Sequence, residues 1–439
     1  MLTEDAKAPL SQSTMGASSS SPSSSSTPAA ALTVGSLQVL GPCCGGRGRT
    51  LGAQGSAPRT APPPPPQAPA GCGGVTRFGA GGLVGQDKWL GGELGDDGCI
   101  YGCPGNAESV LKIDPNTGAV STFGGPLPGK YKWLRGLRAG DGSIYCVPSW
   151  ATSVLRITPS TGACALLGEG LPCLANEAAA QEGRWKWHGG VLANDGCIYG
   201  IPCNAETVLK VDPSTGEIST FGGPFVGKQK WYGGLLGAAD GCIYGCPCNA
   251  DGVLKIDPVA KTATVIGTGL FEEGGMKWHG GVVGGDGAIY ALPNNTDTVL
   301  KIVPGTGECT LLGGGLRGGK RRVGGRYEDK YKYQGGVLGN DGNVYAMPAD
   351  ADRVLRIVCA TGEVGEIGRS FEDLDRCFNK WQNGFVGRDG CVGGEEGGGG
   401  REGGREECLF VFTVCLSVWV GWGTGLYVFA RMNVWVDFR

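Results

Sequence analysis

The stretch from Lys186 to Gly223 shows the hydrophobic pattern on which the rest of the chain is built. In its short runs, apolar residues alternate with small or polar ones, and turn-forming residues separate the runs. A period of two is typical of β-strands. Asn194, Asp195 and Gly196 join the first two of them, and Asp-Gly supplies the positive φ that a two-residue hairpin turn requires. The predicted strands are 188–192, 197–201, 207–211 and 217–221.

The same unit recurs along the chain, and each copy begins with a lysine followed by an aromatic residue. The aromatic residues of the copies are Trp89, Trp133, Trp187, Trp231, Trp278, Tyr333 and Trp381. Four antiparallel strands in about 45 residues is the size of one propeller blade. Since one sheet cannot cover both of its faces, the copies should stack around an axis. The sequence therefore predicts an all-β propeller of four-stranded antiparallel blades, with seven repeats of which the last is incomplete; a six-bladed ring is the alternative.

Changes of composition divide the chain into four parts. Residues 1–74 are rich in Ser, Pro, Ala and Gly, and we expect them to be disordered because they can bury little apolar surface. Residues 75–392 hold the repeats, and residues 393–407 form a Gly/Arg/Glu low-complexity linker. The apolar tail 408–439 is read either as read-through of non-coding sequence or as a membrane anchor through residues 408–430.

The two ends of the repeat region suggest how the ring closes. The sequence VTRFG at residues 75–79 resembles a fourth strand, and the seventh copy stops after its second strand near residue 392. We expect the N-terminal strand to complete the last blade.

The stretch DGCIYGIPCNAETVLKVDPSTGEI, residues 195–218, resembles the repeats of the NHL, SMP-30 and streptogramin-lyase group of propellers. The resemblance covers residues 75–392, and it rests on a DG turn, an IY strand, a VLKID strand and a TG turn. It implies the fold. Lyase and lactonase members of such families use histidine or clustered carboxylates around a divalent metal, and no position of this chain matches that arrangement residue by residue.

In a propeller the first strand of each blade runs innermost, so the starts of these strands share one face with the connections between blades. That face carries the insertions before Arg184 and Lys330, and we expect any ligand there. It also carries a ring of lysines at Lys88, Lys132, Lys186, Lys230, Lys277, Lys332 and Lys380. These lysines predict a positive rim for an anionic ligand or, alternatively, a repeated packing requirement.

Two further rings lie on the same predicted face. The residue after the aromatic varies most, and at this position stand Leu90, Leu134, His188, Tyr232, His279, Gln334 and Gln382. The two histidines are the only ones in the chain, and they are candidate ligand or acid–base groups or merely polar rim residues. Asparagines of the following loop, Asn204 and Asn249 among them, are candidates for ligand contacts or for hydrogen bonds to their own backbone.

The composition narrows the function. The net charge of −3 shows no basic excess, so nucleic acid is not an expected partner, and 19 cysteines in an odd number favour reduced thiols in a cytoplasmic protein. We expect a monomeric, non-catalytic scaffold that binds a protein or a small anionic ligand on its insertion-bearing face, without a cofactor. The alternative is a metal-dependent lyase or hydrolase with one divalent ion near the central channel.

Overall fold

The computed structural model describes residues 87–171, 184–317 and 330–371, all within one unit of the chain. These residues form β-strands and no helix. The strands of the first three sheets are β1 (Trp89–Leu94), β2 (Ile100–Pro104), β3 (Val110–Ile113), β4 (Val120–Phe123), β5 (Trp133–Arg138), β6 (Ile144–Pro148), β7 (Val154–Thr158), β8 (Ala163–Leu167), β9 (Trp187–Leu192), β10 (Ile198–Pro202), β11 (Val208–Val211) and β12 (Ile218–Phe221). The strands of the next three are β13 (Trp231–Leu236), β14 (Ile243–Pro247), β15 (Val253–Asp257), β16 (Thr262–Ile266), β17 (Trp278–Val283), β18 (Ile289–Pro293), β19 (Val299–Val303), β20 (Glu308–Leu312), β21 (Tyr333–Leu338), β22 (Val344–Pro348), β23 (Val354–Val358) and β24 (Glu363–Ile367).

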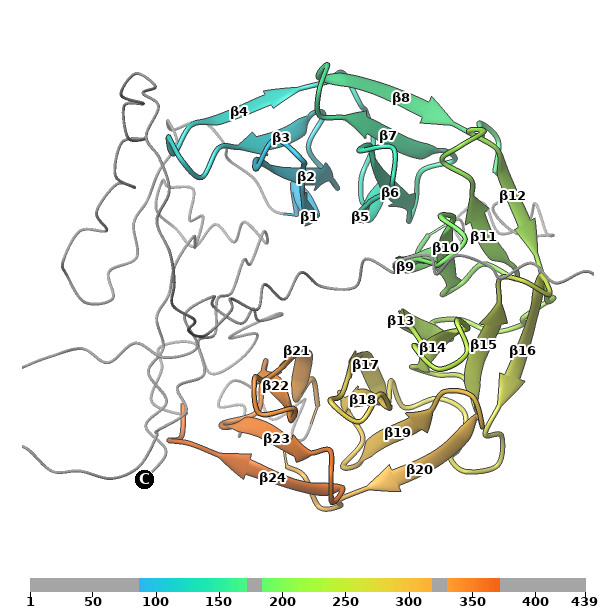
Figure 1. The fold of residues 1–439 in the computed structure, drawn as a ribbon, viewed down its shortest axis with the longest axis vertical. Helices are drawn as coiled ribbons and strands as arrows, with labels where there is room; N and C mark the ends of the chain where they lie inside the picture. Colours follow the sequence, from blue (N-terminus) through green and yellow to red (C-terminus); the bar gives the residue numbers. More distant parts are fainter. Residues whose placement is uncertain (1–86, 172–183, 318–329, 372–439) are drawn as a thin grey trace, which may run out of the picture. The chain divides into compact units, whose positions relative to one another are not determined.

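The strands make six four-stranded antiparallel sheets, numbered here sheet 1 to sheet 6 in chain order. Within each sheet the strands follow one another in sequence, and the first strand is innermost (Figure 1). The first strands touch in series, β1 with β5, β5 with β9, β9 with β13, β13 with β17, and β17 with β21. The predicted all-β propeller with innermost first strands is confirmed. Among the described residues the six sheets do not close into a ring.

Several predictions from the sequence concern segments outside the described residues. They are the segments 1–74, 393–407 and 408–439, and the closure of a seventh blade by residues 75–79 and 380–392. Within the part of the chain that the structure describes, no helix is long and apolar enough to cross a membrane.

The core lies between neighbouring sheets. Leu137 and Val147 of sheet 2, for example, pack with Trp187 and Ile198 of sheet 3 in one buried cluster. The aromatic residue that opens each first strand is buried, and in five sheets its indole N–H donates to a backbone carbonyl, as Trp133 does to Ser153 at 2.7 Å. Burial of these large rings, with their polar edge satisfied, explains why the aromatic recurs in every repeat.

The Asp-Gly turn differs from the prediction in its length. Gly196 has a φ of 79°, as expected, but its N–H donates to the carbonyl of Ala193. The loop therefore spans Asn194, Asp195 and Gly196, the three residues expected to join these strands, but it is a three-residue hairpin with glycine in the left-handed region and not a two-residue turn. Asp195 decides this, because its carboxylate accepts the N–H of Cys197 at 3.0 Å and so stabilises the longer loop.

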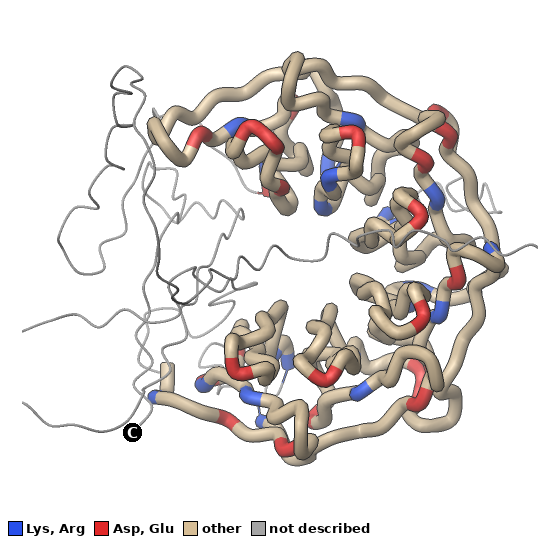
Figure 2. Tube along the Cα trace, in the orientation of Figure 1, with Lys and Arg blue, Asp and Glu red and all other residues tan. Residues whose placement is uncertain are grey.

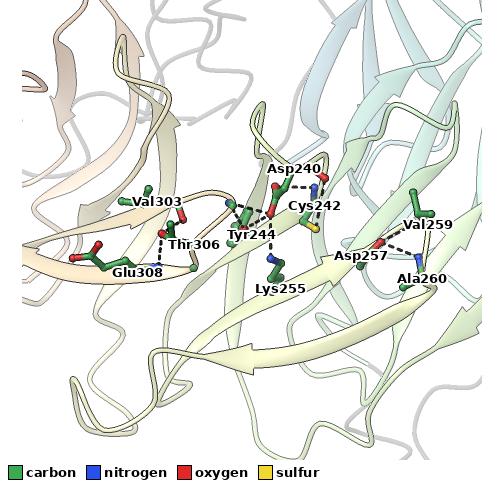
Figure 3. A network of polar contacts seen from close by, with 12 residues as sticks. Asp240, Cys242, Tyr244, Lys255, Asp257, Val259, Ala260, Val303, Thr306 and Glu308 are labelled. Carbon is green, nitrogen blue, oxygen red and sulfur yellow. Dashed lines mark hydrogen bonds and ion pairs between the residues drawn. The ribbon is translucent and has the colours of Figure 1, made fainter. Parts of the chain in front are cut away.

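The carboxylate of this turn also ties the sheets together. In sheet 4, Asp240 accepts hydrogen bonds from Tyr244 at 2.7 Å and Lys255 at 3.1 Å (Figure 3). The same carboxylate accepts the backbone N–H of Gly305, in sheet 5, at 3.1 Å. Asp240, which the sequence placed only in a turn, thus bonds to two side chains of its own sheet and to the backbone of the next sheet.

Candidate binding site at the start of the inner strands

Each inner strand begins with a β-bulge directly after its aromatic residue. In sheet 2, Trp133 pairs with Pro148 and Gly136 pairs with Cys146, so Leu134 and Arg135 together lie opposite one residue. The same shift occurs in the other five sheets. Bulges redirect side chains and are frequent beside functional sites. The variable position predicted from the sequence is the first residue of this bulge.

Three of the predicted site residues come together at these bulges. The ring of His188 stacks on that of Tyr232, with centroids 4.1 Å apart and an interplanar angle of 3°. His279 meets both rings edge-on, at 5.5 Å from His188 and 5.1 Å from Tyr232. Residues far apart in the sequence are therefore neighbours. Gln334 lies half-buried at the equivalent position of β21.

Partial burial keeps both histidines neutral at pH 7. Loss of solvent lowers the pKa of His188 to about 3, and the charges of His279 and Arg135 lower it further. Loss of solvent likewise lowers the pKa of His279 to about 4. A general base works best with a pKa near the working pH, so these imidazoles are poorly suited to proton transfer at pH 7.

The cluster continues onto three aromatic side chains that the sequence analysis did not single out. The ring centroid of Trp185 lies 6.4 Å from that of His188. The ring centroid of Tyr131 lies 5.4 Å from that of Trp185 and 4.8 Å from that of Trp150. We call these six side chains the aromatic row: Tyr131, Trp150, Trp185, His188, Tyr232 and His279. Five of the six rings are partly exposed, and that of Tyr232 is buried.

The predicted lysine ring is turned inward. Lys132, Lys186, Lys230, Lys277 and Lys332 are each at most 8 % exposed, and their amino groups donate to backbone carbonyls. Lys88, only partly buried, lies with its Nζ 5.2 Å from the centroid of the Trp89 ring. Burial lowers the pKa of Lys132 and of Lys230 to about 8, so both remain mostly charged at pH 7. This geometry favours the packing interpretation of the ring over the anion-binding one.

The loop asparagines also connect neighbouring sheets. The side-chain oxygen of Asn204 accepts the N–H of Gln229 at 2.7 Å, and that of Asn249 accepts the N–H of Met276 at 2.8 Å. In both cases the donor belongs to the next sheet, whereas the sequence suggested bonds to the residue's own loop. The donor residues have positive φ, at 51° and 47°. A repeated asparagine thus stabilises a repeated backbone conformation that few side chains adopt.

Sequence reasoning missed Arg135, although the signal was present. At the second bulge position the other five sheets have glycine with positive φ: Gly91, Gly189, Gly233, Gly280 and Gly335. Sheet 2 has arginine there, with φ at 66°. The left-handed region costs a residue with a Cβ about 1–2 kcal/mol. An arginine kept in a glycine position is therefore a candidate functional residue.

The guanidinium of Arg135 is available for a ligand. The side chain is exposed, and among the described residues it has no hydrogen-bond or ion-pair partner. Its neighbour on the same strand, Arg138, is paired with Asp96. These two are the Lys or Arg residues of the six described inner strands, and both belong to β5. Figure 2 shows blue on the tube at the place of β5. Glu93 of β1 is close enough for the charges of Arg135 and Arg138 to act on it, yet burial raises its pKa.

The described residues contain no group of three or more His, Cys, Asp or Glu side chains placed to hold a metal ion. The two histidines approach each other without a third such side chain. Every cysteine in the described ranges is free. A divalent metal therefore stays a prediction.

Comparison with known proteins identifies the fold. No family model and no curated protein matches the chain. Among solved structures, a streptogramin B lyase matches with a TM-score of 0.50 and 15 % identity, over 71 % of this chain and 91 % of that one. A virginiamycin B lyase from Staphylococcus aureus matches with a TM-score of 0.47 and 16 % identity, over 64 % of this chain and 85 % of that one. Hydrazine synthase from Kuenenia stuttgartiensis matches with a TM-score of 0.43 and 15 % identity, over 64 % of this chain and 80 % of that one. The chain is thus a propeller like that of the streptogramin lyases, as its repeats suggested.

Proposed function

We propose that this propeller is a non-catalytic binding protein that holds a small organic anion at the start of its inner strands. The observation that carries the proposal is the exposed guanidinium of Arg135, without a partner among the described residues, in a position that is glycine in the other five sheets. Arginine is well suited to this role because its planar fork pairs with carboxylate and phosphate through two parallel hydrogen bonds.

The side chain of Arg135 lies beside the start of β9. A Cβ built on Gly189 would lie 3.9 Å from Cδ of Arg135, so the arginine side chain runs beside the residue that follows His188. His188 is neutral and adds no charge of its own at pH 7. The buried lysines donate to backbone carbonyls, and Lys132 and Lys230, whose pKa values are about 8, remain mostly charged at pH 7. In this proposal they support the potential and do not touch the ligand.

The test compares two arginine variants. Acetate and inorganic phosphate are titrated calorimetrically into the wild type and into Arg135→Gly, which restores the residue of the other sheets. Arg138→Leu is the matched control, since it removes the same charge from the same strand and introduces a residue found at that position in other sheets. We expect at least a tenfold loss of affinity in Arg135→Gly and little change in Arg138→Leu. Equal affinity in the wild type and Arg135→Gly would refute the proposal.

A metal-dependent lyase or hydrolase is the second candidate, and the approach of His188 to His279 at 5.5 Å is the observation in its favour. Neutral imidazoles can bind a metal. The double variant His188→Ala, His279→Ala should then lose a divalent ion detected by elemental analysis of the purified protein. Retention of all bound metal in that variant would exclude the histidines as ligands.

A further inference from the structure

Sheets 1 and 2 carry cysteines at two positions that face each other across neighbouring sheets. In sheets 3 and 4, a Cβ built on Gly245, the third residue of β14, would lie 3.5 Å from Cγ2 of Ile201, the fourth residue of β10. The third residue of a second strand thus packs on the fourth residue of the preceding second strand. In sheets 2 and 1 these two residues are Cys146 and Cys103.

Cys146 departs from its repeat, and its thiol lies against that of Cys103. The other five sheets have glycine or alanine at this position, namely Gly102, Gly200, Gly245, Ala291 and Ala346. The two Sγ atoms are 2.9 Å apart, and both side chains are 0 % exposed. An S–S bond is about 2.05 Å long, so a small approach would bring the two sulfur atoms to bonding distance.

Sheet 4 provides a comparison within the same chain. Cys246 occupies in β14 the position that Cys103 has in β2, and it is also fully buried. The residue at the facing position of sheet 5 is Ala291, and it belongs to the same buried cluster as Cys246. Cys246 therefore lacks a second thiol at the position where Cys103 has one.

We propose that Cys103 and Cys146 form a disulfide bond that joins sheet 1 to sheet 2. The proposal is independent of anion binding at Arg135. The two cysteines are 43 residues apart in the sequence, and closing a loop of this kind restricts the unfolded chain and so stabilises the folded one. The bond lies beside the bulge that carries Arg135, because a Cβ built on Gly136 would lie 2.9 Å from Sγ of Cys103.

The oxidant is a small disulfide of the glutathione type. The thiolate of one cysteine attacks a sulfur of this oxidant, which leaves a mixed disulfide on the protein and releases one small thiol. The second cysteine then attacks the protein sulfur of the mixed disulfide, forms the bond between Cys103 and Cys146 and releases the second small thiol. The two protons lost by the protein end on the two small thiols, so two protein thiols are oxidised and one small disulfide is reduced.

The burial of the pair determines when the bond forms. Burial, together with the neighbouring Cys103 thiol, raises the pKa of Cys146, so little of the reactive thiolate is present in the folded protein. Neither thiol is exposed to an oxidant once the sheets have assembled. The exchange therefore takes place during folding, and the same burial then shields the bond from reductants.

Peptide mapping of the full chain tests the bond. The protein is unfolded, reduced and refolded with reduced and oxidised glutathione, and its free thiols are alkylated in guanidinium chloride before digestion with trypsin. Cys146 is the only cysteine of the tryptic peptide 139–156. We expect this peptide to be joined to the peptide 89–112, which contains Cys103, and to be released by dithiothreitol. Full alkylation of Cys146, or its linkage to any other peptide, would overturn the proposal.

The variant Cys103→Val identifies the partner, because the peptide 89–112 also contains Cys99. Valine is the residue of sheet 2 at this position, Val147. The linked peptides should disappear in this variant, and dithiothreitol should lower the urea midpoint of the wild type but not that of the variant. Linked peptides that persist would assign the bond to Cys99 and refute the proposed pair. Cys146→Ala, with a residue found in sheets 5 and 6, provides the same comparison of urea midpoints if Cys103→Val does not refold.

The variant Ala291→Cys tests whether the two facing positions are sufficient for a bond. It places a thiol opposite Cys246, in the tryptic peptide 278–301, which has no cysteine in the wild type. After refolding in the same buffer, we expect this peptide to be joined to the peptide 231–255, which contains Cys246. A variant in which the peptide 278–301 is recovered only in alkylated form would contradict the geometric argument for sheets 1 and 2.

Discussion

The Nζ atom of Lys132 lies 2.6 Å from the carbonyl oxygen of Gly105, which belongs to the preceding sheet. The same amino group reaches the carbonyls of Ala107 at 2.8 Å and Gly129 at 3.1 Å. A charged group that is 4 % exposed thus satisfies three backbone acceptors. The lysine of the repeat joins one sheet to the next and is not presented to solvent.

Replacing this lysine should therefore destabilise the fold. We expect Lys132→Met to lower the free energy of unfolding by about 2 kcal/mol, because buried carbonyls lose a charged donor. Urea unfolding measures the change, with Lys130→Met as the control, since Lys130 is exposed two residues away. Acetate binding should persist in Lys132→Met. A variant as stable as the wild type would mean that the amino group is not needed between the sheets.

Arg135→Gly should separate stability from binding. Glycine removes the cost of a left-handed residue, about 1–2 kcal/mol, and adds an entropic cost of about 0.5–1 kcal/mol. We expect the free energy of unfolding to stay the same or rise by up to about 1 kcal/mol, as measured by urea unfolding. The opposite change, Gly189→Ala at a φ of 75°, should be destabilising. A clear loss of stability in Arg135→Gly would show that the arginine contributes to packing.

The two histidines should make stability depend on pH above the range in which carboxylates titrate. Their pKa values in the folded state, about 3 for His188 and about 4 for His279, lie below the unfolded value of about 6.5. The unfolded chain then binds more protons, so stability should fall as the pH drops from about 6.5 towards 4. The double variant His188→Leu, His279→Gln introduces residues found at this position in other sheets, and it should flatten that slope in urea unfolding. An unchanged slope would mean that the histidines are not buried as neutral groups.

A second pH effect is expected at Asp240. Burial alone would raise the pKa of this carboxyl, but hydrogen bonds from Tyr244 and Lys255 outweigh burial and lower it to about 2. The unfolded value is near 3.9, so this contribution to stability is present above pH 4 and is lost as the pH falls towards 2. Asp240→Asn should be less stable at pH 7 and should lose less stability below pH 4. Asp251→Asn, an exposed residue of the same sheet, is the control and should behave as the wild type.

The sequence by itself determined the strands, the four-stranded blade and the number of strands in each repeat. The alternation in 187–192 and the turn at Asp195-Gly196 depend on residues close together in the chain, and local sterics are enough to define them. Stacking of the copies followed because a single sheet leaves apolar surface exposed. The Asp195-Gly196 pair did not reveal the hydrogen-bonding pattern of the turn. That pattern depends on the hydrogen bond from the backbone N–H of Cys197 to the Asp195 carboxylate.

Only the tertiary structure decided where the repeated polar residues point. Lys132 and Asn204 form hydrogen bonds with backbone groups of neighbouring sheets. Their repetition in the sequence indicated a polar interaction at that position but did not identify the partner. His188, Tyr232 and His279 become neighbours because the inner strands converge, which no spacing along the chain specifies. The sequence did contain Arg135 where other copies have glycine. Only the positive φ of Arg135 showed that this position favours glycine and that the arginine is unusual there.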